Sequence, residues 1–266
     1  MKGRIKLKIG FFDSGIGGLS VLHRAMKALP EEEYIFYMDS DHVPYGDRTK
    51  EEIIRYVDEA VNFLVAHDCK AVVIACNTAT AVAAAQMREQ HQIPIIGIEP
   101  AVKPAVENSE HKRVLVIATP VTVKEKKLQL LIDRVDEEHL VDLLALPQLV
   151  RFAENMEFDS EECFSYLKQE LEKYPLENYA DLVLGCTHYN YFKNVYRRII
   201  PQNMKIIDGN EGTVKQLKYL LEKENALEQN TLKVTYYQSG REITEEKVLE
   251  KIESLHQRLE EMERIK

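Results

Sequence analysis

Short apolar runs alternate with longer helical patterns along almost the whole chain, and this alternation limits the folds open to it. The apolar runs are predicted strands: Leu7–Phe12, Tyr34–Met38, Ala71–Ala75, Ile95–Ile98, Val114–Ala118, Leu140–Ala145, Asp181–Gly185, Lys205–Asp208 and Leu232–Gln238. Between them we expect helices over residues 18–28, 49–67, 78–91, 121–134, 159–173, 190–199, 210–224 and 243–265. Strands and helices that alternate in this way form parallel sheets covered on both faces, so a doubly wound α/β fold is predicted.

Two of these helices carry a start signal. Thr49 stands three residues before Glu52, and Asp159 stands three residues before Glu162. In such a capping box each side chain satisfies a free backbone N–H of the other residue. We therefore expect Thr49 and Asp159 to be helix N-caps.

The order of local signals repeats along the chain. The strand ends in IGFFDSGIGG, IFYMDSDHVPYG and VVIACNT are followed, in the same order, by VLVIATPVT, VDLLALPQLV and LVLGCTH. This repetition predicts two similar α/β halves related by a pseudo-twofold axis, with residues 1–99 plus 209–266 as the first domain and residues 100–208 as the second. Because ligands in open α/β sheets bind beyond the carboxyl ends of the strands, the active site should lie between the halves.

Composition excludes several classes of protein. The chain has a formal charge of −9, with 45% hydrophobic and 30% charged residues, which is the balance of a globular protein. This net acidity argues against a nucleic-acid partner, whose footprint would be a basic face. No apolar stretch reaches the roughly 18 residues that a membrane span needs, and the run in MKGRIKLKIGFF is too interrupted for a secretion signal.

The four cysteines differ in their surroundings. They form no CxxC pair and no disulfide framework, which favours a reduced cytoplasmic protein. Cys69 and Cys163 are expected to be buried as small hydrophobic residues, the usual state of a free cysteine. Cys76 and Cys186 each follow a predicted strand and precede a helix, where N–H groups and the helix dipole lower the pKa of a thiol. We therefore predict that Cys76 and Cys186 are the functional pair.

Asp13 and Ser14 end the first predicted strand at an equivalent edge of the sheet. Both are good helix-capping residues, so a cap and a substrate contact are compatible interpretations. The following GIGG resembles a dinucleotide-binding turn, and Asp39 lies where a ribose-binding acid would be expected. However, Ser20 occupies the third glycine position and Asp13 would face the pyrophosphate, so we exclude a nicotinamide dinucleotide.

The segment HVPYGDRT, residues 42–49, is a turn that Pro44 and Gly46 explain by themselves. It also offers backbone N–H groups and the Tyr45 hydroxyl to a carboxylate, and both interpretations stay open.

His188, two residues after Cys186, is either a surface histidine or a partner of the thiol. As a partner it would take the thiol proton or steady the thiolate as an imidazolium. A zinc site of Cys76, Cys186 and His188 is a further alternative, although no closely spaced ligand pair supports it.

The C-terminal helical pattern carries one apolar stripe. A stripe of this kind predicts a packed terminal helix and makes that helix a candidate for a dimer contact; its members are Val248, Ile252, Leu255, Leu259 and Met262.

Five segments together resemble the aspartate/glutamate racemase family, and within it the cofactor-independent glutamate racemases. These segments are FFDSGIGGLSVL, DHVPYGDRT, ACNTATA, IGIEPAVKPA and LGCTHY. The resemblance runs over about residues 8–215. Its most specific part is the paired Cys-Asn-Thr and Cys-Thr-His blocks at their correct separation.

The resemblance implies a role for each matching residue. Cys76 and Cys186 would be catalytic acid/bases on opposite faces of the substrate α-carbon, and Asp13 and His188 would assist them. Glu154, in the loosely matching PQLVRFAEN, would orient the histidine. The ammonium and carboxylate groups of the substrate would be held by Asp13, Ser14, Tyr45, Gly46, Asn77, Thr78, Thr187 and His188, with no metal and no cofactor.

The sequence also departs from the family pattern near several predicted strand ends. Met38 replaces a glycine, Asn190 replaces a proline, the segment 118–120 replaces a glycine-containing turn, and IDGNEGT replaces IDSGEAT. These differences leave the two cysteines in place but leave the substrate open.

We predict a racemase that interconverts L- and D-glutamate and, as the resemblance implies, supplies D-glutamate for peptidoglycan; we also expect a homodimer. Inverting an α-carbon requires removal of a proton on one face and delivery on the other, which one ionised and one protonated thiol can do in both directions. Hydrogen bonds to the carboxylate must stabilise the developing enolate charge. The alternatives are a racemase of aspartate or another amino acid, and an amino-acid-binding module without catalysis.

Overall fold

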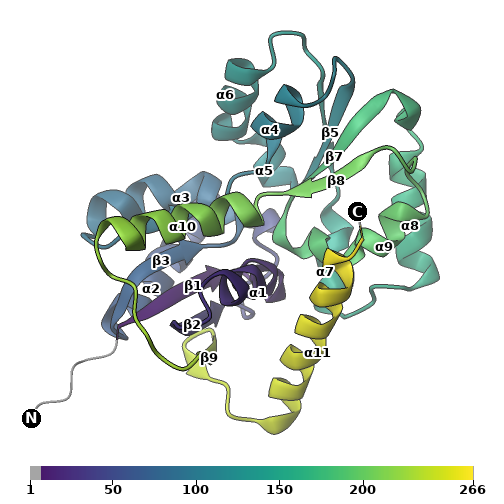
Figure 1. Ribbon diagram of the computed structural model, residues 1–266. Helices are drawn as coiled ribbons and strands as arrows, with labels where there is room; N and C mark the ends of the chain where they lie inside the picture. Colours follow the sequence, from purple (N-terminus) through teal and green to yellow (C-terminus); the bar gives the residue numbers. More distant parts are fainter. Residues whose placement is uncertain (1–6, 266) are drawn as a thin grey trace, which may run out of the picture.

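The structure is a computed structural model that describes residues 7–265. It consists of two α/β lobes, each built around its own sheet (Figure 1). Residues 1–6 of the basic N-terminal segment analysed above lie outside the described residues. Within residues 7–265, no helix is long and apolar enough to cross a membrane.

The larger sheet has the strand order β10-β9-β2-β1-β3-β4. Neighbouring strands are parallel, except that β10 turns back antiparallel to β9. The strands are β1 (Lys8–Asp13), β2 (Glu33–Met38), β3 (Cys69–Ile74), β4 (Ile95–Gly97), β9 (Lys233–Gln238) and β10 (Arg241–Glu242). The smaller sheet, β6-β5-β7-β8, is parallel throughout and contains β5 (Arg113–Ala118), β6 (Val141–Ala145), β7 (Tyr179–Gly185) and β8 (Lys205–Asp208).

The two sheets share one strand order. In the larger sheet β1 lies between β2 and β3, with β4 beyond β3, and in the smaller sheet β5 lies between β6 and β7, with β8 beyond β7. A register shift recurs as well, between Lys8 and Ile9 in the first sheet and between Arg113 and Val114 in the second. The predicted parallel α/β fold with two similar halves is therefore confirmed. The domain limits 1–99 plus 209–266 and 100–208 stay our proposal.

Helices cover both sheets (Figure 1). The α-helices are α1 (Leu19–Ala28), α2 (Lys50–Ala66), α3 (Asn77–Gln90), α4 (Val102–Glu107), α5 (Pro120–Lys124), α6 (Lys126–Val135), α7 (Pro147–Glu154), α8 (Glu161–Leu171), α9 (Lys193–Arg197), α10 (Asn210–Lys223) and α11 (Glu246–Glu263). Short 3₁₀ helices are η1 (Ile16–Gly18), η2 (Tyr45–Asp47), η3 (Leu176–Asn178) and η4 (Thr187–Phe192).

Several predicted helices differ from the observed ones. The helix expected over 121–134 is broken, because Glu125 is extended (φ −71°, ψ 133°) between α5 and α6. The helix expected over 190–199 begins as the 3₁₀ helix η4, and α4 and α7 were not predicted because each is short. The second capping signal is wrong by one residue, since Ser160 caps α8 by accepting the Cys163 N–H at 3.1 Å.

The terminal helix α11 packs as its apolar stripe predicts. Ile252, Leu255, Leu259 and Met262 are buried, and Val248 packs partly buried against the same cluster. The helix begins beyond β9 and β10, contacts α1 and η4, and runs toward α7 (Figure 1). It therefore ties the first lobe to a segment of the second. A dimer contact at this helix stays a prediction.

The capping box of α2 is formed as predicted and offers a test of the fold. The Glu52 N–H donates to Thr49 Oγ1 at 3.2 Å, and the Thr49 N–H donates to Glu52 Oε2 at 2.9 Å. We expect Thr49→Ala to lower the free energy of unfolding by about 1 kcal/mol, measured by urea denaturation. The control is Glu59→Ala at an exposed position within α2. Equal unfolding midpoints for Thr49→Ala and the parent would contradict the prediction.

Candidate active site

The ends of two strands of the larger sheet and one strand of the smaller sheet meet at the predicted site. Asp13 ends β1, Cys76 follows β3, and Cys186 follows β7. Thr187 donates its hydroxyl to Asp13 Oδ2 at 3.1 Å, so the ends of β1 and β7 are in contact across the two lobes. Ser14 Oγ lies 3.6 Å from Cys76 Sγ. The structure thus brings the predicted thiols and their neighbours together between the halves.

Cys76 is the N-cap of α3 and is almost fully buried. Its sulfur accepts the Ala79 N–H at 3.4 Å, a bond that favours the thiolate. Burial nevertheless raises the pKa of Cys76 to about 12, and the charge of Asp13 adds to this effect. The expectation that the helix N-terminus lowers the pKa of this thiol is therefore wrong, because desolvation is the larger effect.

Cys186 begins a buried chain of polar groups. His188 Nδ1 lies 3.8 Å from Cys186 Sγ, and His188 Nε2 lies 2.6 Å from Glu154 Oε1. Burial opposes a charge on His188, but its hydrogen bonds to Cys186 and Glu154 raise the pKa of His188 well above its usual value. Of the two roles left open for this histidine, the arrangement favours the imidazolium that steadies a thiolate. Glu154, at the end of α7, lies where an orienting acid is needed.

Asp13 is a fully buried carboxyl group with three polar neighbours. Its Oδ1 accepts the Gly15 N–H at 2.9 Å and its Oδ2 accepts the Thr187 hydroxyl. Burial raises the pKa of Asp13 to about 6, although the positive charge of His188 and these hydrogen bonds oppose the shift. Asp13 therefore changes its charge close to neutral pH. It does not cap a helix, since its backbone partner, Gly15, lies in the turn before η1.

The glycine-rich turn after β1 has a steric purpose. A β-carbon at Gly17 would lie 2.5 Å from His188 Nδ1 and 2.5 Å from Thr187 Oγ1. At Gly15 it would lie 1.9 Å from Glu154 Oε1, which also accepts the Ile16 N–H at 2.9 Å. The glycines therefore let the turn approach the second lobe, and they are explained without a dinucleotide.

The predicted substrate-binding residues divide into those already paired and those available. The Tyr45 hydroxyl donates to Asp39 Oδ2 at 2.7 Å, a contact that the sequence analysis missed, and Gly46 lies beside Thr119. Asn77 is buried, and its side-chain oxygen has no hydrogen-bond partner among the described residues. It is therefore an available acceptor for an ammonium group.

Thr78 contacts two threonines from the second lobe that the sequence analysis did not assign to the site. Its Oγ1 lies 2.9 Å from Thr119 Oγ1 and 3.2 Å from Thr122 Oγ1. Thr119 follows β5, and Ser14 occupies the same place after β1 in the repeated strand order. The internal repeat was the signal from which Thr119 might have been found.

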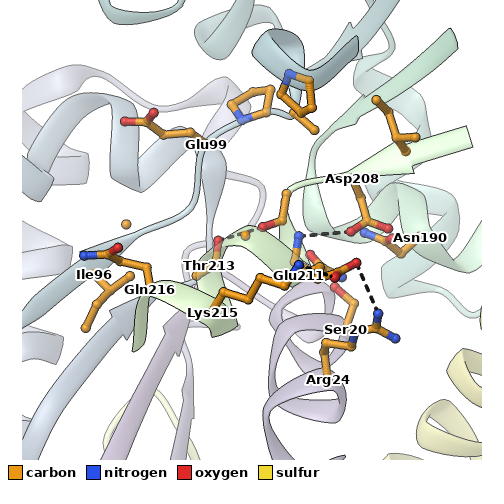
Figure 2. A pocket seen from close by; sticks show the side chains of 18 of the residues that line it. Ser20, Arg24, Ile96, Glu99, Asn190, Asp208, Glu211, Thr213, Lys215 and Gln216 are labelled. Atoms are coloured by element: carbon orange, nitrogen blue, oxygen red, sulfur yellow. Dashed lines mark hydrogen bonds and ion pairs between the residues drawn. The ribbon is translucent and has the colours of Figure 1, made fainter. Parts of the chain in front are cut away.

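Two cavities lie near this region. One of about 230 Å³ is lined by Asn77 and Thr122, next to Cys76. The other, about 1240 Å³, includes Ser20, Asn190 and Asp208 in its lining but neither Cys76 nor Cys186 (Figure 2). The Asn190 side chain donates to the Thr187 carbonyl at 3.1 Å, so this residue, which replaces a proline of the family pattern, supports η4.

The residues offer no clear place for a metal ion at the thiols. Among residues 7–265, the one group of donor atoms gathered closely enough is His23, Glu260 and Glu263, on α1 and α11. Lys27 already forms ion pairs with both of these carboxylates. The zinc arrangement of Cys76, Cys186 and His188 lacks the necessary convergence of donors.

Comparison with known proteins places this geometry in a family. The family model described as Asp/Glu/Hydantoin racemase matches residues 14–217, a span that contains both thiols, Glu154 and His188 and begins one residue after Asp13. A glutamate racemase of Lachnospira eligens is 50% identical over 265 residues, which cover 97% of this chain and 100% of the relative. Glutamate racemase 2 of Bacillus subtilis is 46% identical, with 97% and 98% coverage.

A solved structure agrees with these relatives. The crystal structure of glutamate racemase from Francisella tularensis in complex with D-glutamate superposes with a TM-score of 0.81 at 28% identity, over 95% of this chain and 94% of that chain. The chain therefore belongs to the Asp/Glu/Hydantoin racemase family, and it is an isomerase of the amino-acid racemase type.

Proposed function

We propose that the chain interconverts L- and D-glutamate by a two-thiol mechanism without a cofactor. The observation that carries the proposal is the placement of Cys76 and Cys186 at the ends of strands from opposite lobes, joined through the contact of Thr187 with Asp13. Glutamate as the substrate is supported by curated relatives named glutamate racemases at 50% and 46% identity over nearly the full chain.

The two thiols differ in a way that suits the reaction. Burial raises the pKa of Cys76, so this thiol keeps its proton and can donate it. The imidazolium of His188 stabilises a thiolate at Cys186, which can remove the α-proton from the opposite face. When the reaction runs in reverse the roles exchange, so the second enantiomer meets Cys76 as the base.

The carbanion between the two thiols needs stabilisation from fixed donors. The Thr78 hydroxyl and backbone N–H groups of the surrounding turns are the candidate donors for the substrate carboxylate, whereas the Thr187 hydroxyl already donates to Asp13. The free side-chain oxygen of Asn77 suits the ammonium group. These contacts act without redistributing charge into a cofactor, so their preorganisation in a buried site carries much of the rate enhancement.

The wider role also belongs to the proposal. As the family resemblance implies, the product D-glutamate would supply peptidoglycan synthesis in the cytoplasm. We retain a homodimer as the proposed assembly. Substrate identity is the part of the proposal most directly open to test, because several residues near the strand ends depart from the family pattern.

Substitution of each thiol tests the mechanism. We expect Cys76→Ala and Cys186→Ala each to lower the racemisation rate by at least roughly 10³-fold, because each removes one acid/base group, whereas glutamate binding should persist. The measurement is loss of the α-proton signal of L-glutamate in D₂O by NMR, together with optical rotation. Cys69→Ala is the control, since Cys69 is a buried thiol at the start of β3, at the opposite end of this strand from Cys76.

The outcomes separate the alternatives. Racemisation that persists in either single variant would contradict the two-thiol mechanism. An inert α-proton of glutamate in the parent protein, with exchange of aspartate or another amino acid, would replace the substrate. Binding without exchange of any amino acid would favour an amino-acid-binding module.

The raised pKa of Asp13 predicts a pH-dependent stability. Folding favours the protonated carboxyl, so its stabilising contribution is complete below pH 3.8 and is lost as the pH rises through about 6. At pH 8 the buried charge costs on the order of 3 kcal/mol. We therefore expect Asp13→Asn to exceed the parent in free energy of unfolding by about 3 kcal/mol at pH 8, with no difference below about pH 4.

Urea denaturation of both proteins between pH 4 and pH 8 measures this difference. Asp41→Asn is a control of opposite sign, because a hydrogen bond from Arg241 lowers the pKa of Asp41. A difference between Asp13→Asn and the parent that does not change with pH would disprove the prediction.

A further inference from the structure

Arg258, on the terminal helix α11, connects two segments of the second lobe. Its Nε donates to the backbone carbonyl of Tyr191 at 2.9 Å. Its other two nitrogens donate to Asp159, from Nη1 to Oδ2 at 2.7 Å and from Nη2 to Oδ1 at 3.1 Å, and Nη2 also donates to Asn194 Oδ1 at 3.1 Å. One guanidinium thus holds η4, the start of α9 and the loop between α7 and α8.

These are the segments that carry the acid and the histidine of the site. Tyr191 follows His188 within η4, and Asp159 lies in the loop that leads from Glu154, the last residue of α7, to α8. Glu154 and His188 themselves form the buried 2.6 Å contact that favours the imidazolium. Arg258 therefore fixes the relative position of both partners of that contact without touching either.

A second path through Tyr191 closes the network. The Tyr191 hydroxyl donates to the Ile16 carbonyl at 2.9 Å, and the Ile16 N–H donates to Glu154 Oε1 at 2.9 Å. Phe158 packs on Tyr191 with ring centroids 5.1 Å apart, and the Arg258 guanidinium lies 4.5 Å above the Phe158 ring. Contacts thus connect Arg258 of α11 with the Phe158–Tyr191 pair, and Tyr191 with the glycine turn at Ile16, which contacts Glu154.

The chemistry of the guanidinium explains why an arginine occupies this position. It presents several donors in one rigid plane, so it can bind a carboxylate with two bonds and still reach a backbone carbonyl. A lysine ammonium is a point charge at the end of a flexible stem, so it cannot hold all three acceptors in this geometry. The Arg258 side chain is only 15% exposed, which limits competition from water.

We propose that Arg258 is a positioning residue for the racemase reaction: it holds η4 against the loop that follows α7, so that His188 stays between Glu154 and Cys186. The inference rests on the proposed two-thiol function. It extends that function to a residue of α11, beyond the segment matched by the family model.

The decisive measurement is the titration of the His188 imidazole by NMR of protein labelled with ¹⁵N-histidine. The His188 signal is assigned by its absence in His188→Gln. In Arg258→Met we expect the loosened contact with Glu154 to lower the pKa of His188 by at least about one unit, a tenfold change in its proton affinity. We also expect kcat to fall about tenfold with KM changed less than about twofold, since Arg258 contacts neither thiol nor the substrate-binding groups.

Matched variants separate positioning from a general structural effect. Arg264 is the C-cap of the same helix, and its exposed side chain makes a 3.7 Å ion pair with Glu260. Arg264→Met should leave the titration and kcat unchanged. Arg258→Lys should have a His188 pKa and a kcat between those of Arg258→Met and the parent. Tyr191→Phe removes only the hydroxyl bond to Ile16 and should shift the titration in the same direction by a smaller amount.

Folded Arg258→Met with the parent titration and the parent kcat would overturn the inference. If Arg258→Met does not fold, Arg258→Lys and Tyr191→Phe decide in its place, and parent behaviour in both would overturn it equally. Because the titration needs no turnover, a parent protein without racemisation would refute the proposed function, while the shift of the His188 titration would still test the positioning.

Discussion

The glycine turn after β1 approaches Glu154 and the start of η4 so closely that there is no room for side chains at two of its positions. Gly15 and Gly17 lie where a β-carbon would collide with Glu154 and His188. This approach allows Thr187 to reach Asp13 and the Ile16 N–H to reach Glu154. The polar groups of the site are thus satisfied by partners from the other lobe, so neither lobe forms this arrangement alone.

The repeated fold places two cysteines at equivalent strand ends but surrounds them differently. Cys76 follows β3 and Cys186 follows β7, and these strands hold the same place in their sheets. Desolvation and Asp13 favour the protonated form of Cys76, whereas Cys186 faces His188. Burial alone would disfavour a charge on that histidine, and its hydrogen bonds to Glu154 and Cys186 reverse the effect. A symmetric backbone therefore supports an asymmetric pair of thiols, as the proposed exchange of acid and base roles requires.

The strands were predictable because buried parallel strands are continuous apolar runs, and most residues of the candidate site follow their carboxyl ends. The pKa of Cys76 was predicted in the wrong direction, because a sequence indicates a helix start but not the degree of burial around it. The contact of Tyr45 with Asp39 and the threonine cluster at Thr78 depend on how two segments meet in space, which no local pattern records. Glu154 was found only by resemblance, since the short helix that carries it gave no periodic signal.

Arg258, the proposed positioning residue, could not be predicted from the sequence motifs either. The matched family segment runs from residue 14 to residue 217 and contains both thiols, Glu154 and His188, and Asp13 directly precedes it. The side chain that joins the segments bearing Glu154 and His188 comes from α11, after the chain has completed the smaller sheet and added β9 to the larger one. Arg258 donates to the backbone carbonyl of Tyr191, a group that every residue type offers. The identity of residue 191 therefore does not indicate that Arg258 is its partner. The residues proposed for the chemistry can thus be read from motifs, whereas those proposed to hold them in place emerge only from the folded chain.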